Sequence, residues 1–268
     1  MNRPALEVEI QQRTTEQLGP RSRFRICAYQ RLTSTQDQAR ALARDGAAHG
    51  TVVIAREQTR GRGRLGGSWD SAPALGLYLS IVLRPKRPAA ELPLLSLVTA
   101  VACAEALARA ARLRVELKWP NDLIFRRRKL AGILAELELS EGGAAVVVVG
   151  IGLNLNHGSG DFPDALRRRA ISLRQATGSE YDRAEIAAAV LKRFAHRYSQ
   201  WEAKGPAPVL RRFRSLSPMV RGARVRVDTN GRVFSGITRG LDRQGMLIVA
   251  TDDQRLVHLQ AGEVHLLT

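Results

Sequence analysis

The chain has 268 residues, of which 44% are hydrophobic, so it can bury a sizeable core, and bulk disorder is excluded. Its two cysteines form no C-x-x-C pattern and its five histidines are scattered, which excludes a readable zinc site and predicts a reduced, cytoplasmic protein. The net charge of +17 favours an anionic partner, which would be a nucleotide, an acidic protein or a nucleic acid.

The first part of the chain is predicted to mix strands and helices. Residues 1–24 are polar and mixed in charge, so we expect a loosely ordered lead-in without a secretory signal. The stretch 92–110 predicts a buried helix, because its uncharged run ends at Glu105 and is shorter than the ~20 apolar residues of a membrane span. Between these segments the pattern predicts, in order, a strand at 24–30, a helix at 33–46, and strands at 51–58 and 76–83.

The second part begins with successive strands joined by tight connections, VELKW, LIF, KLAGILAELEL and AAVVVVGIGLNLN. Helices are predicted over about 163–176 and 183–203, followed by a short basic helix, PVLRRFRSL. From about residue 217, short strands with regularly spaced glycines predict a small all-β barrel. The sequence therefore predicts an α+β fold, with a mixed β-sheet domain flanked by helices over 25–216 and the barrel over 217–268.

Two runs of three arginines, at 126–128 and 167–169, stand out in the basic middle of the chain. Neither run has interleaved aromatic residues, which nucleic-acid surfaces often use for stacking. We therefore interpret both runs as solvated surface.

The stretch GRGRLGGSWD, residues 61–70, formally contains the dinucleotide-binding pattern G-x-G-x-x-G. That pattern requires a helix that opens on the last glycine and an acidic residue at a later strand end, and neither is predicted here. Glycines that alternate with Arg62 and Arg64, followed by Trp69, instead favour a loop that closes over an anionic ligand carrying a nucleotide. A plain flexible linker remains the alternative.

Three further stretches place polar groups at predicted strand ends. KWPNDL puts Asn121 and Asp122 after a strand, where Asp122 could hold Mg²⁺ together with phosphates, although an ordinary Pro-Asn-Asp turn is the alternative. RKLAGILAE places Lys129 at the start of a buried strand, with Gly132 admitting a close neighbour; a solvated lysine is the alternative. In GIGLNLN, Asn154 could bind a base edge or simply end the strand in a turn.

The order of these motifs resembles the biotin protein ligases, also called biotin–[carboxylase] holoenzyme synthetases, over roughly residues 25–268. The motifs are S-T-x near the first helix, Q-x-x-G-R-G-R-x-G-x-x-W, K-W-P-N-D, K-L-A-G-I-L and G-x-G-x-N. The resemblance implies an enzyme that joins biotin to ATP, forming biotinyl-5′-adenylate and pyrophosphate. The enzyme would then transfer biotin to one lysine of a biotin carboxyl carrier domain. It also implies a catalytic domain like those of class II synthetases and lipoate ligases, with a last domain that is SH3-like.

The resemblance further implies roles for individual residues. The catalytic residues would be Lys129, Arg64 and Asp122, with Asp122 also holding Mg²⁺. The biotin site would comprise Ser34, Thr35, Gln36, Gln58, Arg62, Gly63, Arg64, Lys129 and Gly132. The ATP and adenylate site would comprise Arg64, Trp69, Asn121, Asp122, Lys129, Gly152 and Asn154.

This chain departs from the family pattern at three positions. Gln36 stands where the family usually has asparagine, and Leu65 and Gly67 replace two loop arginines. We therefore expect the adenylate to be held less tightly than in a relative whose loop has more arginines.

Two other functions remain open at this point. A lipoate or octanoate transferase would share the catalytic fold, whereas the loop with Trp69 and the terminal β domain favour biotin. A basic nucleic-acid-binding module would rest on the charge alone.

Only about 24 polar residues precede the first predicted strand, too few for a helix-turn-helix domain, so we expect a monofunctional ligase without DNA or membrane binding. The oligomeric state is left open, and a homodimer is compatible with the sequence.

Overall fold

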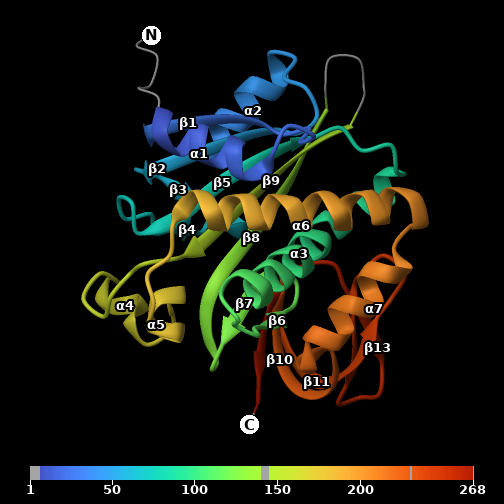
Figure 1. The fold of residues 1–268 in the computed structure, drawn as a ribbon. Helices are drawn as coiled ribbons and strands as arrows, with labels where there is room; N and C mark the ends of the chain where they lie inside the picture. The colour runs from blue at the N-terminus through green and yellow to red at the C-terminus, as the bar shows by residue number, and fades with distance from the viewer. Residues whose placement is uncertain (1–6, 140–144, 230, 268) are drawn as a thin grey trace.

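The computed structural model describes residues 7–139, 145–229 and 231–267. Its largest element is a seven-stranded mixed sheet in the order β1-β2-β5-β9-β8-β7-β6, in which only β1 and β2 run parallel to each other (Figure 1). The strands of this sheet are β1 (Arg25–Leu32), β2 (Thr51–Gln58), β5 (Gly76–Leu83), β6 (Glu116–Lys118), β7 (Asp122–Phe125), β8 (Arg128–Leu139) and β9 (Ala145–Asn154). The predicted mixed sheet is confirmed.

Helices cover both faces of this sheet. The helices α3 (Leu95–Ala110) and α6 (Arg183–Lys204) lie side by side on one face, whereas α2 (Thr35–Arg44) packs on the other, against β2, β5 and β9 (Figure 1). Val52 and Ile54 of β2 belong to the larger core cluster, whereas Val53 belongs to the smaller cluster under α2. Because successive residues of a strand point to opposite faces, a strand covered on both faces must be apolar throughout, which explains the run TVVIA.

The predicted buried helix is confirmed as α3, which follows the 3₁₀ turn η2 (Ala89–Leu94). By length and composition the segment Ala89–Ala110 could cross a membrane, but 78% of its most apolar window is buried inside the protein. Small side chains such as Ala100 and Ala104 allow α3 to pack closely between the sheet and α6. Its apolar character is therefore explained by its place in the core.

A buried carboxylate of α3 ties three helices together. Glu105 of α3 accepts hydrogen bonds from Arg193 Nη2 of α6 at 2.6 Å and from Arg212 Nε of α7 (Ala207–Leu216) at 2.9 Å. Arg197 of α6 binds the same carboxylate, with Nε at 2.9 Å from Oε2. Burial alone would raise the pKa of Glu105, but the hydrogen bonds from the three guanidinium groups lower the pKa to about 2.

The C-terminal part forms a second, antiparallel sheet in the order β13-β12-β11-β10-β14, which fits the predicted small SH3-like domain. Its strands are β10 (Arg221–Thr229), β11 (Arg232–Leu241), β12 (Leu247–Thr251), β13 (Leu256–Leu259) and β14 (Glu263–Leu266), preceded by the 3₁₀ turn η3 (Pro218–Val220). The last predicted strand is thus two strands. Trp119 Nε1 donates to Gly245 O at 3.0 Å, and Val225 and Leu247 join the main core cluster. One continuous core therefore spans both sheets.

Two predictions about local structure are wrong. The lead-in expected to be loosely ordered contains α1 (Val8–Leu18), which packs on α6 and β1 with Ile10 and Thr14 buried. Its apolar residues are too few to show a periodic pattern, so tertiary packing decides its structure. The helix expected over 163–176 is two short helices, α4 (Asp164–Arg167) and α5 (Leu173–Thr177). Between them the chain extends alongside Lys129, with Ala170 in a parallel bridge to it.

Candidate active site

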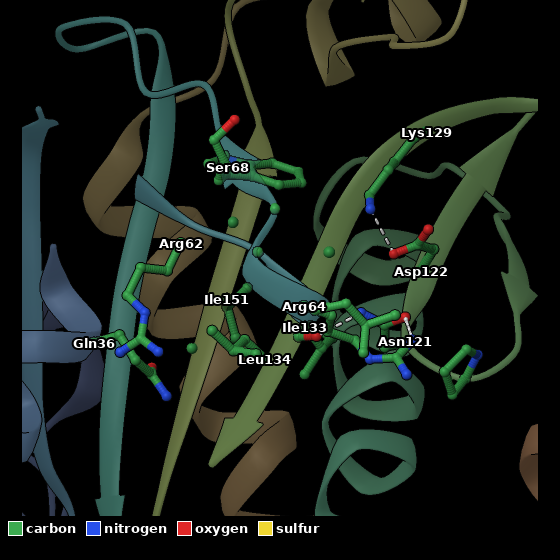
Figure 2. Close-up of a pocket in the computed structure, with 18 of the residues that line it drawn as sticks. Gln36, Arg62, Arg64, Ser68, Asn121, Asp122, Lys129, Ile133, Leu134 and Ile151 are labelled. Atoms are coloured by element: carbon green, nitrogen blue, oxygen red, sulfur yellow. Dashed lines mark hydrogen bonds and ion pairs between the residues drawn. The ribbon is translucent and has the colours of Figure 1, made fainter. Parts of the chain in front are cut away.

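A cavity of about 400 Å³ lies over the middle of the seven-stranded sheet, a size typical of small-molecule sites. Figure 2 shows Gln36 and Arg62 at one end of this cavity and Lys129 and Asp122 at the other. The cavity brings together all of the residues that the sequence placed in the site except Asn154. They are Ser34, Thr35, Gln36, Gln58, Arg62, Gly63, Arg64, Trp69, Asn121, Asp122, Lys129, Gly132 and Gly152. Their individual roles stay predictions.

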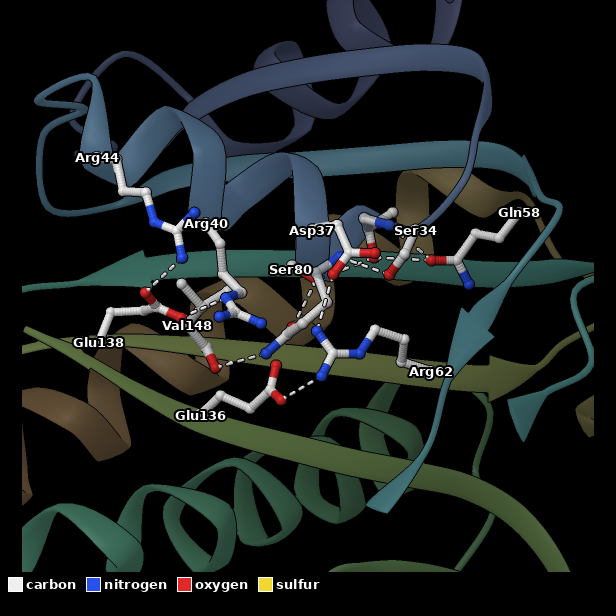
Figure 3. A network of polar contacts seen from close by, with 12 residues as sticks. Ser34, Asp37, Arg40, Arg44, Gln58, Arg62, Ser80, Glu136, Glu138 and Val148 are labelled. Atoms are coloured by element: carbon white, nitrogen blue, oxygen red, sulfur yellow. Dashed lines mark hydrogen bonds and ion pairs between the residues drawn. The ribbon is translucent and has the colours of Figure 1, made fainter. Parts of the chain in front are cut away.

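A buried polar network forms the end of the cavity beneath α2 (Figure 3). Thr35 donates from both its backbone N and its Oγ1 to Gln58 Oε1, at 2.8 and 3.0 Å. Gln36 Nε2 donates to Val148 O at 3.0 Å, and the Ser80 hydroxyl lies 3.0 Å from Gln36 Oε1 and 2.9 Å from Thr35 Oγ1. Polar groups held in place in this way offer donors and acceptors in a defined geometry.

Arg62 is held by two carboxylates at the same end of the cavity. Its Nη1 lies 2.8 Å from Asp37 Oδ1 of α2, and its Nη2 lies 2.7 Å from Glu136 Oε1 of β8 (Figure 3). Because two carboxylates already face this guanidinium, Arg62 adds little net positive charge to the cavity. A contact between Arg62 and biotin, which the resemblance implies, would require one of these ion pairs to be exchanged.

The glycine-rich loop folds as a tight ribbon over the cavity. Its short strands β3 (Gly61–Arg62) and β4 (Ser68–Trp69) pair antiparallel, and the 3₁₀ turn η1 (Arg64–Gly66) connects them. Leu65 at the tip adopts φ 53° and is 73% exposed. A dinucleotide fingerprint would continue into a helix at this point, and the ribbon confirms that this loop does not.

Arg64 is the arginine of the loop that reaches into the cavity without a carboxylate partner among the described residues. Its Nη1 donates to Asn121 Oδ1 at 3.1 Å, and Asn121 Nδ2 donates to Ile133 O at 2.7 Å (Figure 2). Burial lowers the pKa of the Arg64 guanidinium, which nevertheless remains charged near neutral pH. A partly desolvated guanidinium held by an amide is well suited to bind an anionic ligand.

At the other end, Lys129 Nζ lies 2.7 Å from Asp122 Oδ1 and 5.5 Å from the centre of the Trp69 ring. Trp69 in turn lies flat on the backbone of β8 and β9. A Cβ atom at Gly132 would come within 2.9 Å of Trp69 Cζ3, and one at Gly152 within 2.5 Å of Trp69 Cε2. The close neighbour that Gly132 was expected to admit is therefore the Trp69 ring together with the Lys129 side chain.

Asn154 lies outside the cavity lining and is only 5% exposed. Its Nδ2 donates to Lys129 O at 3.3 Å and to Ile171 O at 3.2 Å, so the amide ties β9 to the segment beside Lys129. An adenine contact by Asn154 stays a prediction, and it would require these hydrogen bonds to be exchanged.

The structure also adds residues that sequence reasoning missed. Ser80 was hidden in an apolar strand, where a lone buried hydroxyl was the available signal. Arg169 and the segment 262–265 line the cavity from distant parts of the chain, and Glu263 acts electrostatically on Arg64. No local motif marks these positions, because only the folded arrangement brings the C-terminal sheet against the cavity.

The fold and this lysine-bearing cavity define the class of the protein, a protein ligase of the biotin and lipoate type. Residues 28–154 match the family described as "Biotin/lipoate A/B protein ligase family", and residues 222–267 match "Biotin protein ligase C terminal domain".

Individual relatives narrow this class. The chain is 37% identical over 222 residues to the bifunctional ligase/repressor BirA of Bacillus spizizenii, covering 83% of this chain and 68% of the relative. It is 35% identical to the biotin–[acetyl-CoA-carboxylase] ligase of Paracoccus denitrificans, covering 87% and 97% of the two chains. The biotin protein ligase of Aquifex aeolicus in complex with biotin and ATP superposes with a TM-score of 0.77 at 30% identity, covering 90% and 98%. The chain belongs to the biotin protein ligase family.

Proposed function

We propose that this protein activates biotin with ATP and transfers it to a lysine of a biotin carboxyl carrier domain. The observation that carries the proposal is the cavity itself, which has a buried polar network at one end and the Lys129–Asp122 pair with Arg64 and Trp69 at the other. The relatives named as biotin ligases and the related structure with biotin and ATP support the same substrates.

The two ends of the cavity suit the two ends of biotin. The ureido group carries donors and acceptors, which match Thr35, Gln36 and Ser80. The carboxylate would then point toward Arg64 and Lys129, and the adenine would stack on Trp69. We propose this orientation because the reverse one would place the carboxylate beside Asp37 and Glu136, which hold Arg62.

In the first step, a carboxylate oxygen of biotin attacks the α-phosphorus of ATP, and the bond to the β-phosphate breaks to release pyrophosphate. Two anions must approach each other, so Lys129 and Arg64 would lower the barrier by stabilising charge on the α-phosphate; one such group is often worth about 3 kcal/mol. Asp122, 2.7 Å from Lys129 Nζ, would orient that ammonium group toward the phosphate.

In the second step, the amine of the acceptor lysine attacks the biotinyl carbonyl carbon, AMP leaves with the bonding electrons, and the attacking nitrogen loses a proton. A mixed anhydride hydrolyses in water, so the ribbon at 61–69 would serve to exclude water from it. Whether Asp122 also accepts the lysine proton is a separate proposal, which an Asp122→Asn variant with normal adenylation and slow transfer would support.

Magnesium fits this site only as a companion of the nucleotide. Among the residues that the structure describes, no group of three or more His, Cys, Asp or Glu side chains converges on a metal position. Asp122 supplies one carboxylate, which suits an Mg²⁺ ion that takes its remaining ligands from phosphates and water. When bound, such an ion would neutralise phosphate charge.

The deciding test is pyrophosphate release from ATP and Mg²⁺ in the presence of biotin, lipoate or neither. Release that requires biotin supports the proposal, and release with lipoate alone would assign the protein to the lipoate-activating branch. No release from a folded sample would refute the activity. A gel shift with DNA from its own upstream region tests the further proposal that the protein does not bind DNA.

The acceptor proposed here is the biotin carboxyl carrier domain of a carboxylase, as the name of the Paracoccus relative suggests.

Transfer to that domain takes place where carboxylases are made, so we also propose a cytoplasmic location. Sedimentation of the purified chain, with and without biotin and ATP, would decide between a monomer and a homodimer.

A further inference from the structure

The two arginine runs of the sequence meet beside the cavity. Arg126 and Arg127 form the turn between β7 and β8, and Arg128 begins β8; Arg167 ends α4, and Arg168 and Arg169 follow it. Lys129 N donates to Arg169 O at 2.7 Å, and Ile171 N donates to Lys129 O at 2.9 Å. Residues about 40 positions apart therefore form one surface, which the sequence alone could not show.

Most of this surface has no countercharge. Arg167 pairs with Asp164 at 2.7 Å, but in the described part of the chain no carboxylate lies within ion-pairing distance of Arg126, Arg127, Arg128, Arg168 or Arg169. We call these five residues the arginine patch. Four of them are exposed and Arg128 is half-buried. Five like charges gathered without partners repel one another, so the arrangement costs stability unless an anionic partner binds it.

The arginine patch borders the cavity where the chemistry is proposed. Arg169 lines the cavity, and Arg128 directly precedes Lys129 in β8. The other members lie outside the cavity lining, so they are placed to contact something larger than the nucleotide. A macromolecule that brings a lysine to the Lys129 end of the cavity would therefore lie close to this surface.

We propose that the arginine patch is a docking surface for an acidic face of the acceptor protein, around its target lysine. This inference rests on the proposed function. Guanidinium groups bind carboxylates through paired N–H donors and attract them from a distance, which speeds association. A nucleic acid is less favoured, because the two runs and the turns that carry them expose no aromatic side chain among the described residues; Phe125 is half-buried, with Arg126 over its ring at 5.3 Å.

The test uses the full chain with Arg126→Glu, Arg127→Glu and Arg168→Glu combined, none of which lines the cavity. A matched control combines Arg21→Glu, Arg23→Glu and Arg25→Glu, which are exposed beside β1 at the opposite edge of the sheet from β6 and β7. Both triples change the net charge by the same amount. The acceptor is the carrier domain of an acetyl-CoA carboxylase, used as the natural sequence and with the carboxylates around its target lysine changed to amides.

Pyrophosphate release and transfer are measured separately at low and high salt. We expect the patch triple to keep biotin-dependent pyrophosphate release within about twofold, because none of its three residues lines the cavity. Its KM for the natural acceptor should rise about tenfold at low salt, and this difference should shrink at high salt or with the neutralised acceptor. The control triple should leave the KM for the acceptor near the wild-type value.

Three results would overturn the docking surface. An unchanged KM for the acceptor would show that the patch does not contact it, and an equal loss in the control triple would show a general effect of net charge. A raised KM for ATP with a normal KM for the acceptor would assign the patch to the nucleotide. A wild-type protein that releases no pyrophosphate would refute the proposed function instead, so the two failures are distinguishable.

Discussion

The indole of Trp69 lies directly on the backbone of Gly152, so close that a Cβ atom there would come within 2.5 Å of Trp69 Cε2. A Gly152→Ala substitution therefore displaces the ring that is proposed to stack on adenine. Because Trp69 belongs to a surface ribbon, it can move without unfolding the core. We expect Gly152→Ala to remain folded and to weaken nucleotide binding about tenfold, equivalent to about 1.4 kcal/mol of lost stacking.

Nucleotide titration monitored by tryptophan fluorescence would measure this effect. Gly160→Ala is the matched control, because a Cβ atom at Gly160 meets nothing within 4 Å. Equal nucleotide affinity in the two variants would show that the position of the Trp69 ring on Gly152 does not affect nucleotide binding.

Lys129 is expected to be essential for adenylation and dispensable for folding. It is half-buried at the cavity wall, and its removal leaves Asp122 near solvent rather than in the core. We predict that Lys129→Ala lowers the rate of biotin-dependent pyrophosphate release at least about 100-fold, with an unchanged circular dichroism spectrum. Lys192→Ala on the exposed face of α6 serves as the control. Full activity of the Lys129 variant would refute its role.

The Glu105 cluster predicts how stability depends on pH. The pKa of Glu105 is lowered from 4.5 to about 2, so its contribution is complete above pH 4.5 and disappears as the pH falls toward 2. We expect Glu105→Gln to lower the free energy of unfolding by about 3 kcal/mol at pH 7, because three guanidinium groups lose their counterion. The difference from the wild type should shrink in urea titrations between pH 4.5 and 2. The exposed Glu16→Gln variant should show neither effect.

The exposed tip of the ribbon offers a test of the expected weaker hold on the adenylate, which follows from the two missing loop arginines. Leu65 is 73% exposed beside Gly63 and Arg64, which line the cavity. We predict that Leu65→Arg slows the release of biotinyl-adenylate about fivefold, the effect of one exposed charge pair of about 1 kcal/mol. A quench-flow chase would measure the release, with Leu65→Gln as the uncharged control. Equal release from both variants would contradict the explanation.

Sequence patterns predicted this fold best where local chemistry and packing agree. The run TVVIA of β2 is apolar because both faces of the strand are covered, and its length and β-branched residues indicate a strand. The helix α1 escaped prediction because its order depends on contact with α6 and on the pair between Glu7 and Arg183 at 2.9 Å. Such contacts leave no periodic signal in the segment itself.

The residues of the candidate site were also predictable where a local sequence pattern marks them. The motifs around Arg64, Asn121 and Lys129 were recognisable because each is a short local pattern, and the fold brings them to one cavity. The two hydrogen bonds of Asn154 and the cavity contacts of Glu263 depend on segments distant in the sequence, so no local pattern could predict them.

The segment 262–265, with β14, lines the cavity next to residues encoded more than 100 positions earlier. It is the last part of the cavity wall to leave the ribosome during synthesis. A growing chain therefore cannot complete the cavity wall until the second sheet has formed and packed against the first. A truncated product that ends before β14 would keep Lys129 and Arg64 but lack this part of the cavity wall.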